Sequence, residues 1–227
     1  MNIALILSGG TGTRLGNDIP KQYLEYNGKK IVTYCLETFQ KCDLVDIIWV
    51  VAHQEFYPMF DEVAFSKLKG FSKPGETRQV SIYNGLKDLA HLASEEDVII
   101  IHDAARPFVS EKMICKLIEK NKECDGVIPV LPMKDTVYFS EDGERISELV
   151  ERKKIYAGQA PESFLFGKYL AANERLFPSE IYKINGSTEP AIMAGMNIAM
   201  VSGDEMNFKI TTQQDLERFK EVLRQKA

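Results

Sequence analysis

Cysteine is scarce in this chain and forms no recognisable motif. The 227 residues include four cysteines, and no two of them stand in a CxxC pair. This spacing indicates neither a disulfide framework nor a redox or zinc motif. We interpret the four as small core or surface residues. We predict that the protein is located in the reducing cytoplasm. They are Cys35, Cys42, Cys115 and Cys124.

The chain also lacks a basic excess and long apolar runs. The formal net charge of -5 argues against a nucleic-acid partner, although a local basic cluster would still suit a small anionic substrate. No apolar run approaches the roughly 20 residues of a membrane helix, and residues 1–8 are too short for a signal peptide. We therefore predict no membrane partner. The length suits one domain over residues 1–227.

Short apolar runs alternate with amphipathic stretches along the chain. Such runs are typical of central strands of a parallel sheet. The alternation predicts an α/β fold with a doubly wound, mostly parallel twisted sheet, in which ligands bind beyond the carboxyl ends of the strands. The expected strands are 3–7, 47–51, 98–101, 126–130 and 197–201. The expected helices are about 30–41, 56–67, 77–91, 110–122, 163–177 and 212–226.

Residues 132–158 break this alternation. Thr136–Phe139, the turn Ser140–Gly143 and then Ile146–Tyr156 predict a β-hairpin. A two-stranded arm is marginal in water by itself. We therefore expect the arm, about 132–158, to pack on a second subunit, which makes the protein a homodimer.

A glycine-rich, basic loop follows the first expected strand. Its residues 7–16 read Leu-Ser-Gly-Gly-Thr-Gly-Thr-Arg-Leu-Gly, and Lys21 comes shortly after. Backbone N–H groups of such a loop can cradle phosphates, and Arg14 with Lys21 adds two positive charges. That combination suits nucleotidyl transfer, in which negative charge builds on the α-phosphate and on the leaving pyrophosphate.

Other nucleotide loops and other protein classes fit less well. No Lys-Ser or Lys-Thr follows Gly16, so the loop is not a P-loop, and Gly16 comes one position too late for a dinucleotide fingerprint. A glycosyltransferase would usually need an Asp-x-Asp pair, which the sequence lacks. A non-catalytic nucleotide sensor remains an alternative if Arg14, Lys21 and Asp103 do not converge.

Further polar residues follow other strands. Asp103 stands at the carboxyl end of strand 98–101, where a carboxylate can hold Mg²⁺ against phosphate oxygens. Arg106 could bind phosphate or bridge Asp103, and Lys209 could also face the site. We interpret His102 as a packing residue, and for Arg78 one alternative is a solvated residue at the start of a helix.

Taken together, the motifs resemble the family that contains 2-C-methyl-D-erythritol 4-phosphate and ribitol-5-phosphate cytidylyltransferases. The similarity runs in order through nearly the whole chain. The matching segments are residues 9–14 (Gly-Gly-Thr-Gly-Thr-Arg), 20–23 (Pro-Lys-Gln-Tyr), Arg78 with Ser81, 102–107 (His-Asp-Ala-Ala-Arg-Pro), 134–136 (Lys-Asp-Thr), 158–161 (Gly-Gln-Ala-Pro) and 207–211 (Asn-Phe-Lys-Ile-Thr).

The resemblance implies roles for individual residues. Catalytic groups that stabilise the α-phosphate would be Arg14, Lys21 and Lys209. The nucleotide would be bound by Ser8, Gly9, Gly10, Gly12, Gly75, Ser81 and Ala104. Asp103 would bind the metal, Mg²⁺, and the acceptor would be bound by Arg106, Thr136, Arg152 and Thr188. The family uses its hairpin as a dimer arm, so Arg152 would serve the neighbouring subunit.

The implied reaction is attack of an acceptor phosphate on the α-phosphorus of CTP, with release of pyrophosphate. Departures from the family pattern fall on the acceptor side, at Ala160, Glu162 and Glu189. They favour a polyol or sugar phosphate such as ribitol 5-phosphate, feeding a surface polymer such as teichoic acid or capsule. The alternative is methylerythritol phosphate, in isoprenoid precursor synthesis.

Overall fold

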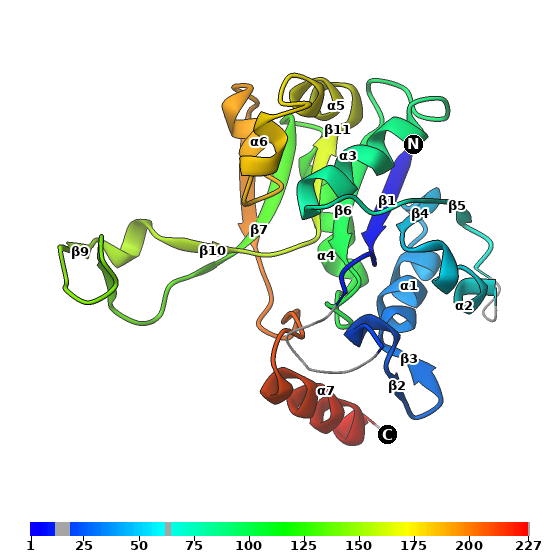
Figure 1. Cartoon of the computed structure of the whole chain (residues 1–227), viewed down its shortest axis with the longest axis horizontal. Coiled ribbons are helices and arrows are strands. Elements are labelled where there is room, and N and C mark those ends of the chain that lie inside the picture. Colours follow the sequence, from blue (N-terminus) through cyan, green and yellow to red (C-terminus); the bar gives the residue numbers. More distant parts are fainter. Residues whose placement is uncertain (12–18, 62–64, 227) are drawn as a thin grey trace.

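The computed structural model describes residues 1–11, 19–61 and 65–226, so Gly12 and Arg14 lie outside the described residues. Its centre is an eight-stranded sheet in which β1 runs parallel to both of its neighbours, β4 and β6 (Figure 1). The strands are β1 Asn2–Leu7, β4 Ile47–Val51, β5 Leu68–Ser72, β6 Val98–Asp103, β7 Gly126–Pro132, β10 Tyr156–Gly158, β11 Glu162–Leu165 and β12 Ile198–Ser202. The predicted mixed α/β fold is confirmed.

All five predicted strands are present, but the sheet also contains strands that the apolar pattern did not indicate. β11 runs antiparallel between β6 and β7, and β10 extends the antiparallel pairing along β7. The helix predicted over 163–177 was therefore wrong at its start, because residues 162–165 are held as a strand by partners on both sides. Helix α5 begins only at Phe166.

The helix predicted over 56–67 was wrong as well. Among the described residues of that range, only Pro58–Asp61 (α2) is α-helical, and β5 follows at Leu68. The aromatic residues here pack by ring stacking: Phe56 on Tyr23 and Tyr57 on Phe71, with centroids 4.1 and 4.2 Å apart. These tertiary contacts account for the apolar spacing that suggested a longer helix.

Helices cover both faces of the sheet, as a doubly wound fold requires. The helices are α1 Ile31–Lys41, α2 Pro58–Asp61, α3 Arg78–Leu89, α4 Glu111–Lys120, α5 Phe166–Glu174, α6 Glu189–Met193 and α7 Gln213–Lys226. One buried cluster joins residues of α1, α2 and α4 to alternate strand residues such as Ala4 and Ile6. A second cluster joins α3, α5 and α6 to Ile3 and Leu5. Successive side chains of β1 therefore point alternately into two separate cores, one on each face of the sheet.

The hairpin arm projects from the sheet, at the left of Figure 1. It is shorter than predicted: β8 (Val137–Phe139) pairs with β9 (Glu148–Val150). The return strand ends at Val150, a 3₁₀ turn follows at 152–154, and Tyr156–Gly158 already belongs to the central sheet as β10. Another small ribbon joins β2 (Glu25–Tyr26) to β3 (Lys29–Lys30).

His102 is a packing residue in β6, as predicted. Its side chain is fully buried, Nε2 lies 3.1 Å from the carbonyl oxygen of Arg106, and the ring centroid lies 5.2 Å from that of Phe39. Burial lowers the pKa of His102 to about 4 from its usual 6.5. The group therefore belongs to the hydrophobic core in its neutral form.

This histidine predicts a pH-dependent stability. As the pH falls from about 6.5 to about 4, the unfolded chain takes up a proton at His102 that the folded chain excludes, so the free energy of unfolding falls by on the order of 3 kcal/mol. Urea unfolding at pH 7 and pH 4.5 measures this loss. The loss should be smaller in His102→Asn and unchanged in His91→Asn, which alters an exposed histidine. Equal losses in all three proteins would contradict the assignment.

Candidate active site

A cavity of about 540 Å³ opens at the carboxyl ends of the parallel strands. Segments that follow β1, β4, β5 and β6 all contribute to its wall, as expected for a doubly wound sheet. Its lining residues are Leu7, Gly9, Gly10, Thr11, Lys21, Gln22, His53, Gly75, Glu76, Thr77, Arg78, Ser81, Asp103, Ala105 and Lys209. The structure thus brings together many of the residues that the sequence analysis proposed for the nucleotide.

The glycine turn after β1 forms one wall of the cavity, and the side chain of Gln22 holds it in place. Gln22 donates two hydrogen bonds from Nε2, to the carbonyl oxygens of Ser8 and Gly10, both at 2.7 Å. A Cβ at Gly9 would lie 2.4 Å from Cβ of Pro74, so this position accepts glycine only. The sequence analysis assigned no role to Gln22, although it stands in a segment that carried the resemblance.

A second tight turn, between β5 and α3, lies against the first, because Pro74 directly precedes Gly75. Ser81 Oγ accepts a hydrogen bond from the Gly75 amide at 2.9 Å and donates one to the Thr77 carbonyl at 2.9 Å. A Cβ at Gly75 would lie 2.3 Å from Cγ1 of Val80. Ser81 therefore shapes the turn through its hydroxyl, and the turn borders the cavity.

Asp103 is a negatively charged side chain surrounded by positively charged ones at the cavity. Its Oδ1 lies 3.1 Å from Nε of Arg78, and its Oδ2 lies 3.0 Å from Nζ of Lys209 and 3.8 Å from Nε of Arg106. Burial opposes ionisation of this carboxyl, but the surrounding cations, Arg78 and Lys209 foremost, outweigh it and hold the pKa of Asp103 well below its usual range. Asp103 is therefore a carboxylate throughout the physiological pH range.

Lys209 reaches the cavity because hydrogen bonds hold its segment against the turn that follows β6. The Ile210 amide donates to the Ala105 carbonyl at 2.8 Å, and Arg106 Nη1 donates to the Asn207 carbonyl at 2.6 Å. Asn207 is itself fully buried and donates to the Ala160 carbonyl at 2.7 Å. These contacts bring a lysine from near the C-terminus beside a carboxylate that ends a central strand.

Arg78 is one-third exposed, but it is not simply a solvated residue at the start of a helix. Besides contacting Asp103, its Nη1 donates to Ser187 Oγ at 2.7 Å. Ser187 in turn donates to Glu162 Oε2 at 2.5 Å, and Thr188 Oγ1 donates to the same oxygen at 3.0 Å. A continuous chain of polar contacts therefore runs from the carboxylate in the cavity to Thr188.

Glu162 was noted in the sequence only as a departure from the family pattern. It is 8% exposed, and burial raises the pKa of its carboxyl, opposed by the charge of Arg78. A buried carboxyl that accepts two hydroxyl donors beside an arginine is an electrostatic partner for that arginine. Its neighbours come from α3 and from the turn before α6, so no local pattern could have revealed them.

Several predicted residues do not line the cavity. Ser8 is buried, and its hydroxyl contacts the Tyr23 hydroxyl at 2.9 Å, while the Ala104 amide donates to the Leu7 carbonyl at 3.0 Å. Thr136 and Arg152 lie exposed at the base of the arm, where Arg152 Nη1 donates to the Lys134 carbonyl at 2.5 Å. The roles predicted for these four residues stay predictions.

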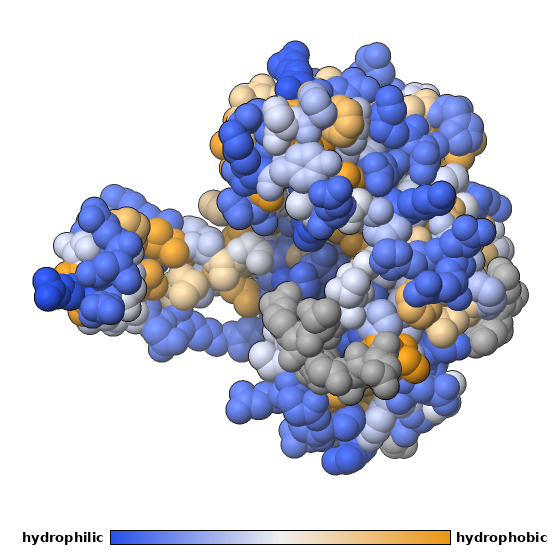
Figure 2. Space-filling view, in the orientation of Figure 1, coloured by the Kyte–Doolittle hydropathy of each residue, from blue (hydrophilic) through white to orange (hydrophobic). Residues whose placement is uncertain are grey.

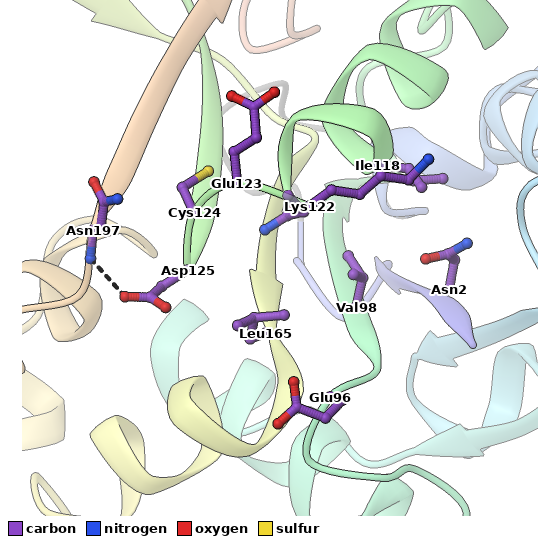
Figure 3. Close-up of a pocket in the computed structure, with 11 residues that line it drawn as sticks. Asn2, Glu96, Val98, Ile118, Lys122, Glu123, Cys124, Asp125, Leu165 and Asn197 are labelled. Atoms are coloured by element: carbon purple, nitrogen blue, oxygen red, sulfur yellow. Dashed lines mark hydrogen bonds between the residues drawn. The ribbon is translucent and has the colours of Figure 1, made fainter.

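A second cavity, also about 540 Å³, lies at the amino ends of the strands (Figure 3). Three carboxylates, Glu96, Glu123 and Asp125, stand on its wall with a single lysine, Lys122. Asp125 accepts a hydrogen bond from the Asn197 amide at 2.8 Å, which the dashed line in Figure 3 marks. This mostly acidic lining does not suit a triphosphate.

Comparison with known proteins agrees with this geometry. The family model described as 2-C-methyl-D-erythritol 4-phosphate cytidylyltransferase matches residues 2–225. A ribitol-5-phosphate cytidylyltransferase of Streptococcus agalactiae serotype V is 32% identical over 225 residues, which is 97% of this chain and 94% of that protein. A 2-C-methyl-D-erythritol 4-phosphate cytidylyltransferase of Geobacter metallireducens is 36% identical over 220 residues, covering 94% of this chain and 93% of that protein.

Solved structures show the same architecture. The crystal structure of 2-C-methyl-D-erythritol 4-phosphate cytidylyltransferase from Francisella tularensis aligns with a TM-score of 0.82 and 28% identity, over 97% of this chain and 98% of that one. Relatives of both acceptor types are thus similar to this chain. The chain belongs to the 2-C-methyl-D-erythritol 4-phosphate cytidylyltransferase family.

Proposed function

We propose that this protein transfers CMP from CTP to a polyol or sugar phosphate of the ribitol 5-phosphate kind and releases pyrophosphate. An acceptor phosphate oxygen forms a bond to the α-phosphorus of CTP, and the bond from that phosphorus to the β-phosphate bridge breaks with its electrons on pyrophosphate. The observation that carries this proposal is the convergence of two glycine turns, Lys21, Lys209 and Asp103 on one cavity. The alternative acceptor is 2-C-methyl-D-erythritol 4-phosphate.

The chain's own residues supply positioning and charge. Glycine at positions 9 and 75 lets the two turns pack against Pro74 and Val80 at the cavity wall, and Lys21 and Lys209 place positive charge where the α-phosphate and pyrophosphate become more negative. The acceptor phosphate is already an anion near neutral pH, so the reaction needs no general base. Arg14 adds a further charge in this proposal, on the strength of the family resemblance.

The donor set fits a magnesium ion. Mg²⁺ prefers hard oxygen ligands and is typically held by one or two carboxylates together with substrate phosphates. Asp103 offers such a carboxylate at the cavity wall, ionised and 7% exposed. When bound, the ion would neutralise negative charge on the phosphates. Lys209 and Arg78 would hold the Asp103 carboxylate in place for it.

The acceptor belongs beside Thr188 and Arg106 in this proposal, next to the chain of contacts from Arg78 to Glu162. A carboxyl at position 162 and an alanine at position 160 replace the glutamine and threonine usual in the family. The carboxyl changes the charge beside Arg78, and the alanine removes a hydroxyl group. We therefore favour an acceptor other than methylerythritol phosphate. We also propose that the protein acts on small molecules in the cytoplasm.

The arm supports a homodimer in which Thr136 and Arg152 serve the neighbouring subunit's site. Large hydrophobic side chains stand out from it into solvent, seen in orange in Figure 2; Ile146 is 66% exposed and Leu149 is 64% exposed. Exposed apolar groups on a thin ribbon are typical of a contact surface. Among the described helices, none has the length and apolarity to cross a bilayer.

Pyrophosphate release tests the function. The protein is incubated with CTP, Mg²⁺ and either ribitol 5-phosphate or 2-C-methyl-D-erythritol 4-phosphate, and initial rates are compared side by side. We expect a higher kcat/KM with ribitol 5-phosphate. A higher value with methylerythritol phosphate would select the alternative, and no release with any polyol phosphate from folded protein would refute the transferase proposal.

Glu162→Gln tests the acceptor side. The substitution keeps the side-chain shape and removes a negative charge beside Arg78, so an anionic acceptor meets a more positive surface. We expect the KM for the acceptor phosphate to fall about five-fold, close to 1 kcal/mol, at saturating CTP. Steady-state kinetics at pH 8 with varied acceptor measure it.

Glu189→Gln provides the matched control. Glu189 is the neighbouring departure, but its Oε2 accepts hydrogen bonds only from the amides of Asn185 and Gly186, at 2.8 and 3.4 Å, at the start of α6. We expect its KM for the acceptor to stay within two-fold of the unmodified protein, because this carboxylate is bound to backbone amides at the start of α6 and is not held against Arg78. An unchanged KM in Glu162→Gln as well would contradict an electrostatic role for Glu162 beside the acceptor.

A further inference from the structure

Two of the scattered cysteines come together in the fold. Cys42 directly follows α1, and Cys115 lies in the middle of α4, 73 residues later in the chain. Their sulfur atoms are 3.9 Å apart. Glu111, the first residue of α4, stands one helical turn before Cys115 and so points to the same side of the helix. The nucleotide cavity includes none of these three residues.

The geometry of this cluster matches a metal site. One ligand atom from each of Cys42, Glu111 and Cys115 can be chosen so that all three lie within 4.8 Å of one another. Two sulfurs bound at about 2.3 Å to a tetrahedral zinc ion would be about 3.8 Å apart, close to the observed separation. The thiols therefore already stand at the spacing that a shared ion requires.

The surroundings favour a thiophilic divalent cation. Two thiolates and one carboxylate carry three negative charges, against two positive charges on such an ion. Lys67 donates from Nζ to the Cys42 carbonyl at 2.7 Å, which places another positive charge beside the cluster. Cys42 is buried, Cys115 is partly exposed and Glu111 is exposed, so the cluster opens on the surface and leaves room for water as a fourth ligand.

We infer that Cys42, Cys115 and Glu111 form a binding site for Zn²⁺ or a similar thiophilic divalent cation, separate from the magnesium site. The bound ion would join the end of α1 to α4, two helices that cover the same face of the sheet. Binding to the folded chain alone stabilises it by mass action. This site is independent of nucleotidyl transfer, so it stands or falls apart from the proposed function.

Cobalt spectroscopy tests the site in the full-length protein. The reduced protein is titrated with Co²⁺ in buffer with excess Mg²⁺, which occupies hard-oxygen sites. We expect a thiolate-to-cobalt charge-transfer band that saturates at one equivalent and disappears when Zn²⁺ is added. Saturating Zn²⁺ should also raise the Tm by about 5 °C. The band should be lost in Cys42→Ser and Cys115→Ser, and Glu111→Gln should weaken cobalt binding at least ten-fold.

Cys124→Ser is the matched control, because Cys124 is a partly exposed cysteine outside the cluster, and this variant should keep the whole band. Glu111→Gln alters an exposed residue, so it keeps the test decisive even if the variant of buried Cys42 does not fold. No thiolate band in the unmodified protein, or a band that persists in Cys115→Ser, would overturn the proposal. So would a band that Cys124→Ser abolishes.

Discussion

Replacing Lys21 or Lys209 by alanine is expected to lower kcat for pyrophosphate release by on the order of 100- to 1000-fold. Both lysines line the cavity, and Nζ of Lys209 is held 3.0 Å from Asp103. An ammonium group fixed in this way stabilises charge that develops only in the transition state, so its loss should act on kcat more than on KM. Steady-state kinetics with varied CTP separate the two parameters.

Lys87→Ala is the control for these variants. Lys87 is an exposed lysine on α3 and takes no part in the cavity, so its removal should leave kcat unchanged. Circular dichroism and Tm establish that each variant is folded. A rise in the KM for CTP with kcat within three-fold of the unmodified protein would contradict a transition-state role and would leave the lysines as ground-state binding groups.

Asp103→Asn is expected to reduce kcat at least 100-fold and to weaken the dependence of the rate on Mg²⁺. The amide keeps the shape of the side chain but not its charge, so Arg78, Lys209 and Arg106 lose their shared counter-charge. We also expect the free energy of unfolding at pH 7 to fall by about 2 kcal/mol, the scale for hydrogen bonds to a charged group that is mostly buried.

The stability loss in Asp103→Asn should depend on pH with a definite sign. The folded pKa of Asp103 lies below its unfolded value of about 4, so the carboxylate contributes stability above pH 4 and loses that contribution as the pH falls further. The variant and the unmodified protein should therefore approach equal stability below about pH 4, as urea unfolding would measure.

Asp125→Asn is the matched control for Asp103. Asp125 also pairs with a lysine, Lys168, but in the second cavity at the amino ends of the strands. We expect no change in kcat and a stability change within about 1 kcal/mol, as for a surface pair. If Asp103→Asn kept kcat and its Mg²⁺ dependence within ten-fold of the unmodified protein, Asp103 would not be the metal-binding group.

The parts of the site that could be predicted depend on residues close in sequence. Gly9 and Gly10 follow a strongly apolar strand, and Asp103 ends another, so both had to lie at the carboxyl edge of the sheet. The contacts of Arg78 could not be predicted, because its partners, Asp103 and Ser187, are 25 and 109 residues away. The residues that predict the start of a helix do not indicate that its first side chain will face a buried carboxylate.

By itself, the sequence determined the alternation of strands and helices, the glycine turn after the first strand and the family. The first two are local features, because the period of a strand and the backbone freedom of glycine involve only neighbouring residues, whereas the family follows from motifs spread along the chain. The close packing of Gly9 against Pro74 is a tertiary contact. Only the tertiary structure decided that β11 is a strand, that Arg78 connects Asp103 with Glu162, and that Cys42 lies beside Cys115. Such contacts depend on how segments that are distant in sequence are arranged around the sheet. The local pattern of residues does not predict that arrangement.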